Sequence, residues 1–190
     1  MKSKRPAGAP PDSAALRADT ALLLRCQNGD LEAFQELVKR YSPAAVRIAR
    51  VLLKSNEEAM DCSQDAFVLA LEKLAAFDAA KPFFPWFYVL LKNVCLKRLR
   101  RIRVRREAAL DGHDVAQASG SANAEASVAA VQKALAKLSA EHREVIILRH
   151  WEDLPYQSIA AATGVSIGTV MSRLHYARLQ LQRVLAEEVL

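Results

Sequence analysis

The stretch TGVSIGTVMSRLHYAR, residues 163–178, reads as a turn followed by a helix with a polar face. Gly164 supplies the backbone freedom that a tight turn requires, and Ser166 is well placed to cap a helix that follows. Upstream, Pro155 opens a short helix that Gly164 ends. Apolar residues then recur at helical spacing: Ile167, Val170, Leu174, Ala177 and Leu181. A short helix, a glycine-containing turn and a second helix with a polar face are typical of a helix-turn-helix.

The polar face of this second helix points to DNA. In a helix-turn-helix the second helix enters the major groove, where residues near its N-terminus contact base edges. Four side chains on the face can bond or stack: Thr169, Ser172, Arg173 and Tyr176. Arg173 can pair with a guanine, while the two hydroxyl groups can reach bases or phosphates. The alternative is an ordinary amphipathic helix of a bundle, and the pattern alone leaves both interpretations open.

The rest of the chain also predicts helices. The 190 residues are 52% hydrophobic and 25% charged, include only 6 glycines, and contain no β-branched run that alternates with period two. Helices are expected with Asp30, Asn56 and Ser139 as N-caps, and another with Pro85 in its first turn. The predicted fold class is therefore all-α: two small helical domains joined by a flexible linker, the second a helix-turn-helix (winged-helix-like) DNA-binding domain.

Composition and charge divide the chain into parts. Residues 107–127, EAALDGHDVAQASGSANAEAS, are small and polar without periodicity, which indicates a flexible acidic linker. Residues 20–106 carry 16 Lys/Arg and 9 Asp/Glu, so the first domain is basic. Residues 128–190 form the second, nearly neutral domain, and residues 1–19 are expected to be a disordered tail. A basic first domain favours a polyanionic partner.

Several functional classes are disfavoured. No run of about 18 apolar residues is long enough to span a membrane, and the polar N-terminus lacks a signal peptide, so a cytoplasmic protein without membrane insertion is expected. The cysteines Cys26, Cys62 and Cys95 lie far apart without a CxxC motif. They are predicted to be buried apolar residues in a reducing compartment. No histidine lies at a spacing that would complete a zinc site with them, so neither a metal nor a cofactor is predicted.

A second notable stretch, FFPWFYVLLKNVCLKRLRRIRVRR at residues 83–106, combines aromatics with cations. Residues 92–106 hold eight basic residues and no acid. One helical stripe carries an aromatic, an amide and two cations: Trp86, Asn93, Lys97 and Arg100. Aromatic rings that stack on bases, beside cations that hold phosphates, make a single-strand-binding surface. The alternative is a core tryptophan beside a solvated basic face.

A third stretch places polar side chains on one helix face. Asp61, Gln64 and Asp65 are three and four residues apart and are expected opposite Phe67 and Leu71. Paired carboxylates can serve metal or acid–base chemistry, but no third carboxylate or histidine follows at a suitable spacing. Catalysis is therefore not expected. A solvated helix face and a protein-docking face remain as alternatives.

These three stretches, in this order, resemble bacterial sigma factors of the extracytoplasmic-function (ECF) group of the sigma-70 family. DCSQDAFVLALEKL is similar to the family's D-x-x-Q-[DE]-x-F segment, and FPWFYVLLKNVCLKRLRR to its F-x-x-W-L-[YF]-x-I-x-x-N-x-x-x-x-x-x-R-R segment. LSAEHREVIILRHWEDLPYQSIAAATGVSIGTVMSRLHYARLQL matches the closing segment, which ends in G-[VC]-S-x-G-T-V-x-S-R-L-x-x-A-R. The resemblance covers about residues 21–106 and 128–187.

The resemblance implies a sigma factor that directs RNA polymerase core enzyme to promoters by −35 recognition and −10 melting, and that is not an enzyme. Residues 20–106 would be the sigma region 2 domain, which docks on the β′ coiled coil and captures an unstacked base of the −10 element. Residues 128–190 would be the region 4 domain, which reads the −35 element, with the β flap as a further polymerase contact. The linker would pass through the polymerase interior, and an anti-sigma factor is an expected partner.

The resemblance also assigns residues by position. The residues expected to dock on the polymerase are Asp61, Gln64, Asp65 and Phe67. Those expected at the −10 element are Phe83, Trp86, Tyr88, Asn93, Lys97, Arg100 and Arg101. Those expected at the −35 element are Ser166, Thr169, Ser172, Arg173, His175 and Tyr176.

The chain also departs from the family pattern, and other interpretations compete. Met171 and Tyr176 stand where many members have another polar or basic residue, so the −35 sequence does not transfer. An extra proline in AAKPFFPW leaves the flipped-base specificity open. One rival is a LuxR-like helix-turn-helix regulator that acts on duplex DNA without being a polymerase subunit. Another is a helical adaptor that binds only protein. Neither needs the single-strand surface.

Overall fold

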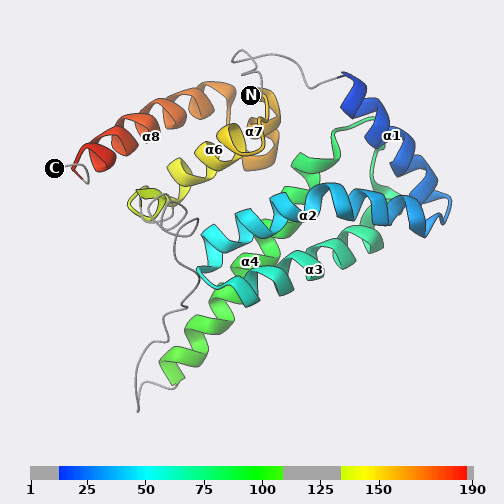
Figure 1. The fold of residues 1–190 in the computed structure, drawn as a ribbon, viewed down its shortest axis with the longest axis horizontal. Helices are drawn as coiled ribbons and strands as arrows, with labels where there is room; N and C mark the ends of the chain where they lie inside the picture. The colour runs from blue at the N-terminus through cyan, green and yellow to red at the C-terminus, as the bar shows by residue number, and fades with distance from the viewer. Residues whose placement is uncertain (1–12, 109–133, 188–190) are drawn as a thin grey trace.

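The computed structural model describes residues 13–108 and 134–187, and its regular elements are all helices (Figure 1). In chain order they are α1 (Ser13–Gln27), α2 (Leu31–Leu53), α3 (Asn56–Lys73), the 3-10 turn η1 (Leu74–Ala76), α4 (Phe83–Ala108), α6 (Ala140–His150), α7 (Tyr156–Thr163) and α8 (Ile167–Glu187). The all-α prediction is confirmed. Because the described residues include no strand, they contain no wing, so "winged-helix-like" was wrong for this part of the chain.

The helices begin where local side-chain chemistry places them, with one correction. Asp30 caps α2 as predicted, because its carboxylate accepts the N–H of Ala33. Asn56 was predicted to cap the next helix, and that was wrong. Ser55 has the extended backbone of an N-cap, and its hydroxyl accepts the N–H of Glu58, so Asn56 is already the first residue of α3.

The N-terminal prediction also needs correction. Residues 13–19 were assigned to a disordered tail, but they belong to α1. The buried carboxylate of Asp19 accepts hydrogen bonds from both Arg40 and Tyr41 of α2. Together with the burial of Leu22 and Leu23, these contacts hold α1 against α2. The partners lie about twenty positions further along the chain, so no local pattern marks them.

The expected linker is only partly described. α4 runs to Ala108, so residues 107 and 108 are helical, and residues 109–127 of the predicted linker lie outside the described residues, as do residues 1–12 of the predicted tail. Figure 1 shows α4 between the bundle of α1–α3 and the group α6–α8. α4 contacts α2 and α3 on one side and α7 on the other.

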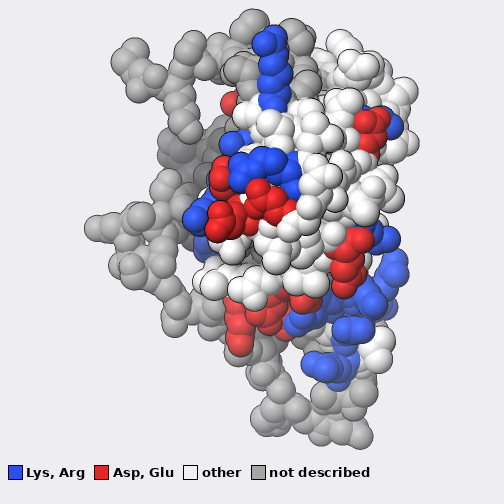
Figure 2. Space-filling model, turned by 90° about the vertical axis from the view of Figure 1, so that its right-hand side faces the viewer, with Lys and Arg blue, Asp and Glu red and all other residues white. Residues whose placement is uncertain are grey.

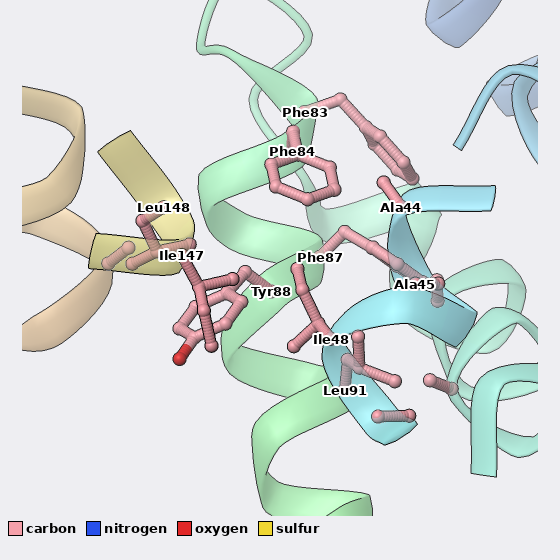
Figure 3. Packing of buried hydrophobic residues seen from close by; sticks show 14 of the residues in the cluster. Ala44, Ala45, Ile48, Phe83, Phe84, Phe87, Tyr88, Leu91, Ile147 and Leu148 are labelled. Carbon is pink, nitrogen blue, oxygen red and sulfur yellow. The ribbon is translucent and has the colours of Figure 1, made fainter. Parts of the chain in front are cut away.

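The first domain is built on an aromatic core. Phe87 is fully buried and stacks on Phe67 of α3 at 4.4 Å and on Phe83 at 5.5 Å between ring centroids. Tyr41 of α2 packs on Phe83 and Phe84 at 5.3 and 5.4 Å. Figure 3 shows Phe87 lying towards Ala45 and Ile48 of α2. Aromatic contacts of this kind stabilise a fold beyond the area that they bury.

The second domain has the predicted helix-turn-helix. Ser139 caps α6, Gly164 ends α7 with φ 72°, and Ser166 accepts the N–H of Thr169 at the start of α8. The apolar stripe of α8 is buried at three positions: Val170, Leu174 and Ala177. Ile167 was expected to belong to this stripe, but it is 46% exposed at the first position of α8, so that part of the prediction was wrong.

Candidate nucleic-acid interface

The polar face of α8 carries the predicted −35 residues at its N-terminal end. The hydroxyls of Ser166 and Thr169 lie 2.9 Å apart, and Ser172 donates to the carbonyl of Thr169 at 3.0 Å. Ser166 therefore acts first as the helix cap, while the hydroxyl groups of Thr169 and Ser172 are held in fixed positions. Tyr176 is 59% exposed, and the ring of His175 meets it edge to face at 5.4 Å.

Arg173 is the cation of this face and is half-buried. The pKa of the Glu141 carboxyl is lowered by its own backbone N–H and by Ser139, and the nearby charge of Arg173 lowers it further. The structure thus brings the predicted −35 residues to one exposed helix end.

The predicted stripe along α4 is also present, but unlike the polar face of α8 it includes an aromatic ring that packs against other rings. Trp86 is half-buried, and its ring lies 4.5 Å from Phe77 and 5.7 Å from Phe83. The polar members of the stripe, Asn93, Lys97 and Arg100, are exposed, and so is the neighbouring Arg101. An aromatic ring with one supported face and a row of cations beyond it has the parts of a surface for unpaired bases.

Two predicted −10 residues do not lie on this exposed stripe. Phe83 is fully buried in the aromatic core and is one of the rings against which Trp86 packs. Tyr88 is only 2% exposed and projects from α4 towards Ile147 of α6 (Figure 3). Neither side chain is open to DNA in this arrangement. Both remain predictions for the −10 region, Phe83 as a support for Trp86.

Tyr88 belongs to a contact between the two domains. Its hydroxyl donates to the carboxylate of Glu144 in α6 at 2.8 Å, and Lys92 of α4 donates to the same oxygen at 2.7 Å. Burial, and then the charge of Glu144, raises the pKa of Tyr88, so the phenol stays protonated and remains a donor. The Glu144 side chain is only 11% exposed, and its carboxylate binds both Tyr88 and Lys92 of α4.

A second polar contact also joins the two domains. Arg47 of α2 forms an ion pair with Glu152, and its guanidinium lies 5.8 Å from the centre of the Trp151 ring. Arg47 and the two residues after α6 that it contacts do not belong to any of the predicted sites. Sequence reasoning missed them because the ion pair joins residues 105 positions apart.

An apolar groove of about 1080 Å³ lies where α4 begins, beside the start of α7 and α8. Its lining includes Trp86, Val89, Pro155, Tyr156 and Ile167, with Lys73 and Lys81 among its charged members. The exposure of Ile167, which the helical pattern did not predict, is explained by its place at this groove. Trp86 and Phe77 both line this groove, so Trp86 borders open space.

The charged surfaces are separated along the molecule. Four exposed arginines occupy the C-terminal half of α4: Arg100, Arg101, Arg103 and Arg105. In Figure 2 basic side chains gather towards the lower end of the view, and acidic side chains lie next to them. The end of α4 projects at the same height in Figure 1. A polyanion that approaches this end therefore meets cations over the last turns of α4.

The predicted docking face lies on α3. Asp61, Gln64 and Asp65 are exposed on this helix, whereas Phe67 is buried in the core. Leu71 was expected on the buried side, but it is 39% exposed, so that part of the prediction was wrong. Two apolar side chains widen the exposed face: Met60 and Val68.

Charges from α4 reach part of this face. Arg98 lies 2.5 Å from Glu58 and 3.5 Å from Asp65, while Asp61 makes no ion pair with any residue that the structure describes. Within residues 13–108 and 134–187, Asp65 therefore has a cation as an ion-pair partner and Asp61 has none. Phe67 stacks on Phe87 and can contribute to docking only from within the core.

The cysteines are buried, as predicted. Cys62 of α3 and Cys95 of α4 are neighbours, and burial raises the pKa of Cys95 to about 12. Thiols of this kind are protonated and poor nucleophiles. Among residues 13–108 and 134–187, no three metal-ligating side chains gather, and no helix is both long and apolar enough to cross a bilayer.

The fold and the surfaces define a class: a DNA-binding protein with a basic helical domain followed by a helix-turn-helix domain. Two family models match the chain, Sigma-70 region 2 over residues 37–105 and Sigma-70, region 4 over residues 129–181. The first match covers the segment that carries the docking face and the α4 stripe, and the second covers α6, α7 and most of α8.

Relatives of known type agree with these matches. The chain is 34% identical over 170 residues to the ECF RNA polymerase sigma factor SigM of Mycobacterium tuberculosis, covering 89% of this chain and 85% of SigM. It is 32% identical to the RNA polymerase sigma factor NccH of Alcaligenes xylosoxydans xylosoxydans, covering 88% and 94% of the two chains.

Solved structures show the same fold. The structure of CnrH in complex with the cytosolic domain of CnrY superposes with a TM-score of 0.71 at 30% identity, covering 90% of this chain and 98% of CnrH. The sigma factor RpoE in complex with the anti-sigma factor NepR, from Bartonella quintana, gives 0.68 at 30% identity, covering 80% and 96%.

The chain belongs to the ECF group of sigma-70 factors. It is a sigma factor, which directs RNA polymerase to promoters, and it is not an enzyme. The LuxR-like alternative is not supported, because a regulator of that kind does not account for the region 2 match over residues 37–105.

Proposed function

We propose that this sigma factor uses three separate surfaces in turn, on α3, α8 and α4. Residues 20–106 would form the domain that docks on core polymerase and opens the −10 element, and residues 128–190 the domain that reads the −35 element. The observation that carries this proposal is the α4 stripe, where a half-buried ring precedes exposed amide and cationic side chains. Duplex reading alone does not require such a surface.

The α3 face would meet the polymerase first. Asp61 offers a carboxylate that has no ion-pair partner in the described part of the chain, and Gln64 and Asp65 extend the polar surface along the same helix. Met60 and Val68 add exposed apolar area, which is what a protein partner can bury. Phe67 would act indirectly by fixing α3 on the core. The β′ coiled coil is the partner that we propose for this face, and the β flap is a further polymerase contact.

The α8 face would read the −35 duplex. Arg173 is the residue best suited to a guanine because a guanidinium can bond two acceptors of that base at once. Thr169 and Ser172 offer hydroxyl groups near the N-terminal end of the helix, where base edges are within reach. His175 and Tyr176 lie one turn further along and would contact the backbone or flanking bases. Ser166 would contribute mainly by capping the helix.

The α4 face would act once the −10 duplex parts. Trp86 would stack on an unpaired base, Asn93 would bond its edge, and Lys97, Arg100 and Arg101 would hold phosphates. Phe83 would support Trp86 from below. Tyr88 and Lys92 are bound by Glu144 in the arrangement seen here, so their use at the promoter would require the two domains to separate.

The solved relatives suggest a regulatory partner. CnrH is bound to the cytosolic domain of CnrY, and RpoE to the anti-sigma factor NepR. On this basis we propose that an anti-sigma factor also binds this chain. We also propose that this sigma factor acts in the cytoplasm. Residues 107–127 would be the flexible connection that lets the two domains reach elements on separate parts of a promoter.

Reconstitution tests the proposal directly. Purified protein is added to core polymerase on a library of promoters, and the transcripts are compared with those from core enzyme alone. Specific initiation from a subset of promoters, with opening near −10 and protection near −35, is the expected result. Binding to duplex DNA that is unchanged by polymerase, with no specific transcript, would contradict the proposal.

A further inference from the structure

The segment between α3 and α4 is fixed by a residue of α1. Gln27, the last residue of α1, donates its side-chain amide to the carbonyl of Leu74 at 2.9 Å and to the carbonyl of Phe77 at 2.6 Å. These bonds join parts of the chain 47 and 50 positions apart. Phe77 follows η1 with an extended backbone, so helix continuation does not satisfy its carbonyl, and Gln27 supplies the missing donor.

The residue held in this way supports the Trp86 ring. Phe77 is buried, its ring centroid lies 4.5 Å from that of Trp86, and it meets Phe83 edge to face at 6.3 Å. Trp86 therefore rests on a pair of rings, one from α4 itself and one from the preceding segment. The position of the second ring depends on where the backbone at residue 77 is held.

The chain after Phe77 is also constrained. Asp78 accepts the N–H of Ala80 with its side chain at 3.0 Å and the N–H of Lys81 with its carbonyl at 2.9 Å. The turn therefore has a defined shape and leads directly into α4. A shift at residue 77 would be passed on to the start of α4 because the short turn has little freedom to absorb it.

We infer that Gln27 is a positioning residue for capture of the melted −10 strand, because its amide holds Phe77 in place beneath Trp86. Gln27 lies outside residues 37–105, which the region 2 family model matches. The inference rests on the proposed function of Trp86. A stacking platform must be held to within a fraction of an ångström to keep its geometry, and the two bonds from Gln27 supply that restraint.

Gln27→Glu is the sharpest variant because it keeps the shape of the side chain and replaces the donor by an oxygen that faces two carbonyls. Gln27→Met keeps the length without polar atoms. Gln35→Glu is the matched control, since Gln35 is exposed on α2 and the charge change is the same. All variants are made in the full chain, and Trp86→Ala is run beside them.

Four measurements are made, and the last of them is made only on the variants that keep Trp86. Binding to core polymerase and −35 protection report the other two surfaces, and permanganate reactivity reports −10 opening. Acrylamide quenching of Trp86 fluorescence reports the ring itself, in a Trp151→Phe background that leaves Trp86 as the one tryptophan of the chain. The expected result for Gln27→Glu is about tenfold less opening, comparable to weakening one stacking contact, with faster quenching of Trp86 and the other two activities within about twofold.

Each outcome then has a meaning. Normal opening with Trp86→Ala contradicts the proposed function of Trp86 and, with it, this inference. If Trp86→Ala is defective in −10 opening but Gln27→Glu shows normal opening and unchanged quenching, the inference about Gln27 is overturned. The proposed function of Trp86 then stands. If Gln27→Glu loses polymerase binding and −35 protection together with a large drop in melting temperature, Gln27→Met decides. Selective loss of opening in Gln27→Met upholds the inference, and equal loss of every activity overturns it.

Discussion

α8 and α4 both carry residues proposed to contact promoter DNA, but the two helices are built in different ways. The polar residues of α8 stand on a short apolar seam near the helix end, and all but the half-buried Thr169 and Arg173 are exposed. Those of α4 extend from an aromatic core, and Tyr88 and Lys92 are held by Glu144 of the other domain. A duplex can be read by exposed hydrogen-bonding groups alone. Holding an unpaired base needs a rigid ring, and the α4 surface has its ring built into the core.

The largest expected effect tests whether either DNA surface works without the α3 face. Asp61→Arg together with Asp65→Arg should abolish most binding to core polymerase, because both side chains are exposed on α3 and their charges would be reversed. Helicity should persist, since neither residue is part of the core. Pull-down with core enzyme, beside a circular dichroism spectrum, measures both. Retention of core enzyme at the level of the unaltered protein would show that docking lies elsewhere.

The α8 surface should show sequence selectivity. Arg173→Ala should weaken binding to the preferred −35 duplex by about 1–3 kcal/mol, the value of a bidentate contact to guanine. Binding to scrambled −35 duplex should change much less. Titration of both duplexes with the polymerase complex provides the comparison. Equal losses on the two sequences would mean that Arg173 contacts only the backbone.

The α4 surface should instead show a salt effect. Lys97→Ala should weaken binding evenly across sequences and lower the slope of log affinity against log salt by about one. The reason is that a phosphate contact releases counterions and carries no sequence information. Affinities measured over a range of salt concentrations test this. If Lys97→Ala and Arg173→Ala behave alike on scrambled DNA, the division between the two helices is wrong.

The smallest expected effect concerns the contact between the domains. Glu144→Gln keeps an acceptor for Tyr88 but removes the charge that binds Lys92, so the isolated protein should bind a single-stranded −10 oligonucleotide about twofold to fivefold more tightly. The ion pair is partly exposed, with Lys92 at 32%, and pairs of this kind contribute about 0.2–1 kcal/mol. Fluorescence anisotropy measures the affinity. Glu36→Gln is the control, because it removes the same charge from an exposed residue of α2. An equal gain in affinity in the control would show that the effect comes only from the change in net charge.

Local patterns in the sequence predicted much of this molecule. The caps at Asp30, Ser139 and Ser166 and the left-handed Gly164 depend on neighbours within four residues, so spacing and residue type were sufficient. The cap of α3 was predicted wrongly, because the prediction named Asn56 where the backbone uses Ser55, one residue earlier.

What could not be predicted depends on distant partners. Residues 13–19 read as polar chain, but they are helical, and Asp19 is held by contacts with α2. The two bonds of Gln27 and the contact of Tyr88 with Glu144 join residues 47 to 56 positions apart, and no periodicity encodes such pairs. Ile167 and Leu71 followed helical spacing but are exposed, because spacing indicates a face of a helix without indicating where the neighbouring helices end.

We propose that the α4 surface acts after the duplex opens, whereas the α8 surface acts before. Permanganate reactivity of the −10 bases, measured with a Trp86→Ala, Asn93→Ala double variant, tests this order of action. Stacking contributes about 1–3 kcal/mol per base, enough to offset much of one unstacking step. We predict normal binding to core polymerase, normal −35 protection, absent −10 reactivity on duplex DNA, and restored transcription from a promoter pre-melted by mismatches. A large fall in melting temperature with loss of all activities and no rescue by the pre-melted promoter would contradict the claim and would make Trp86 a core residue only.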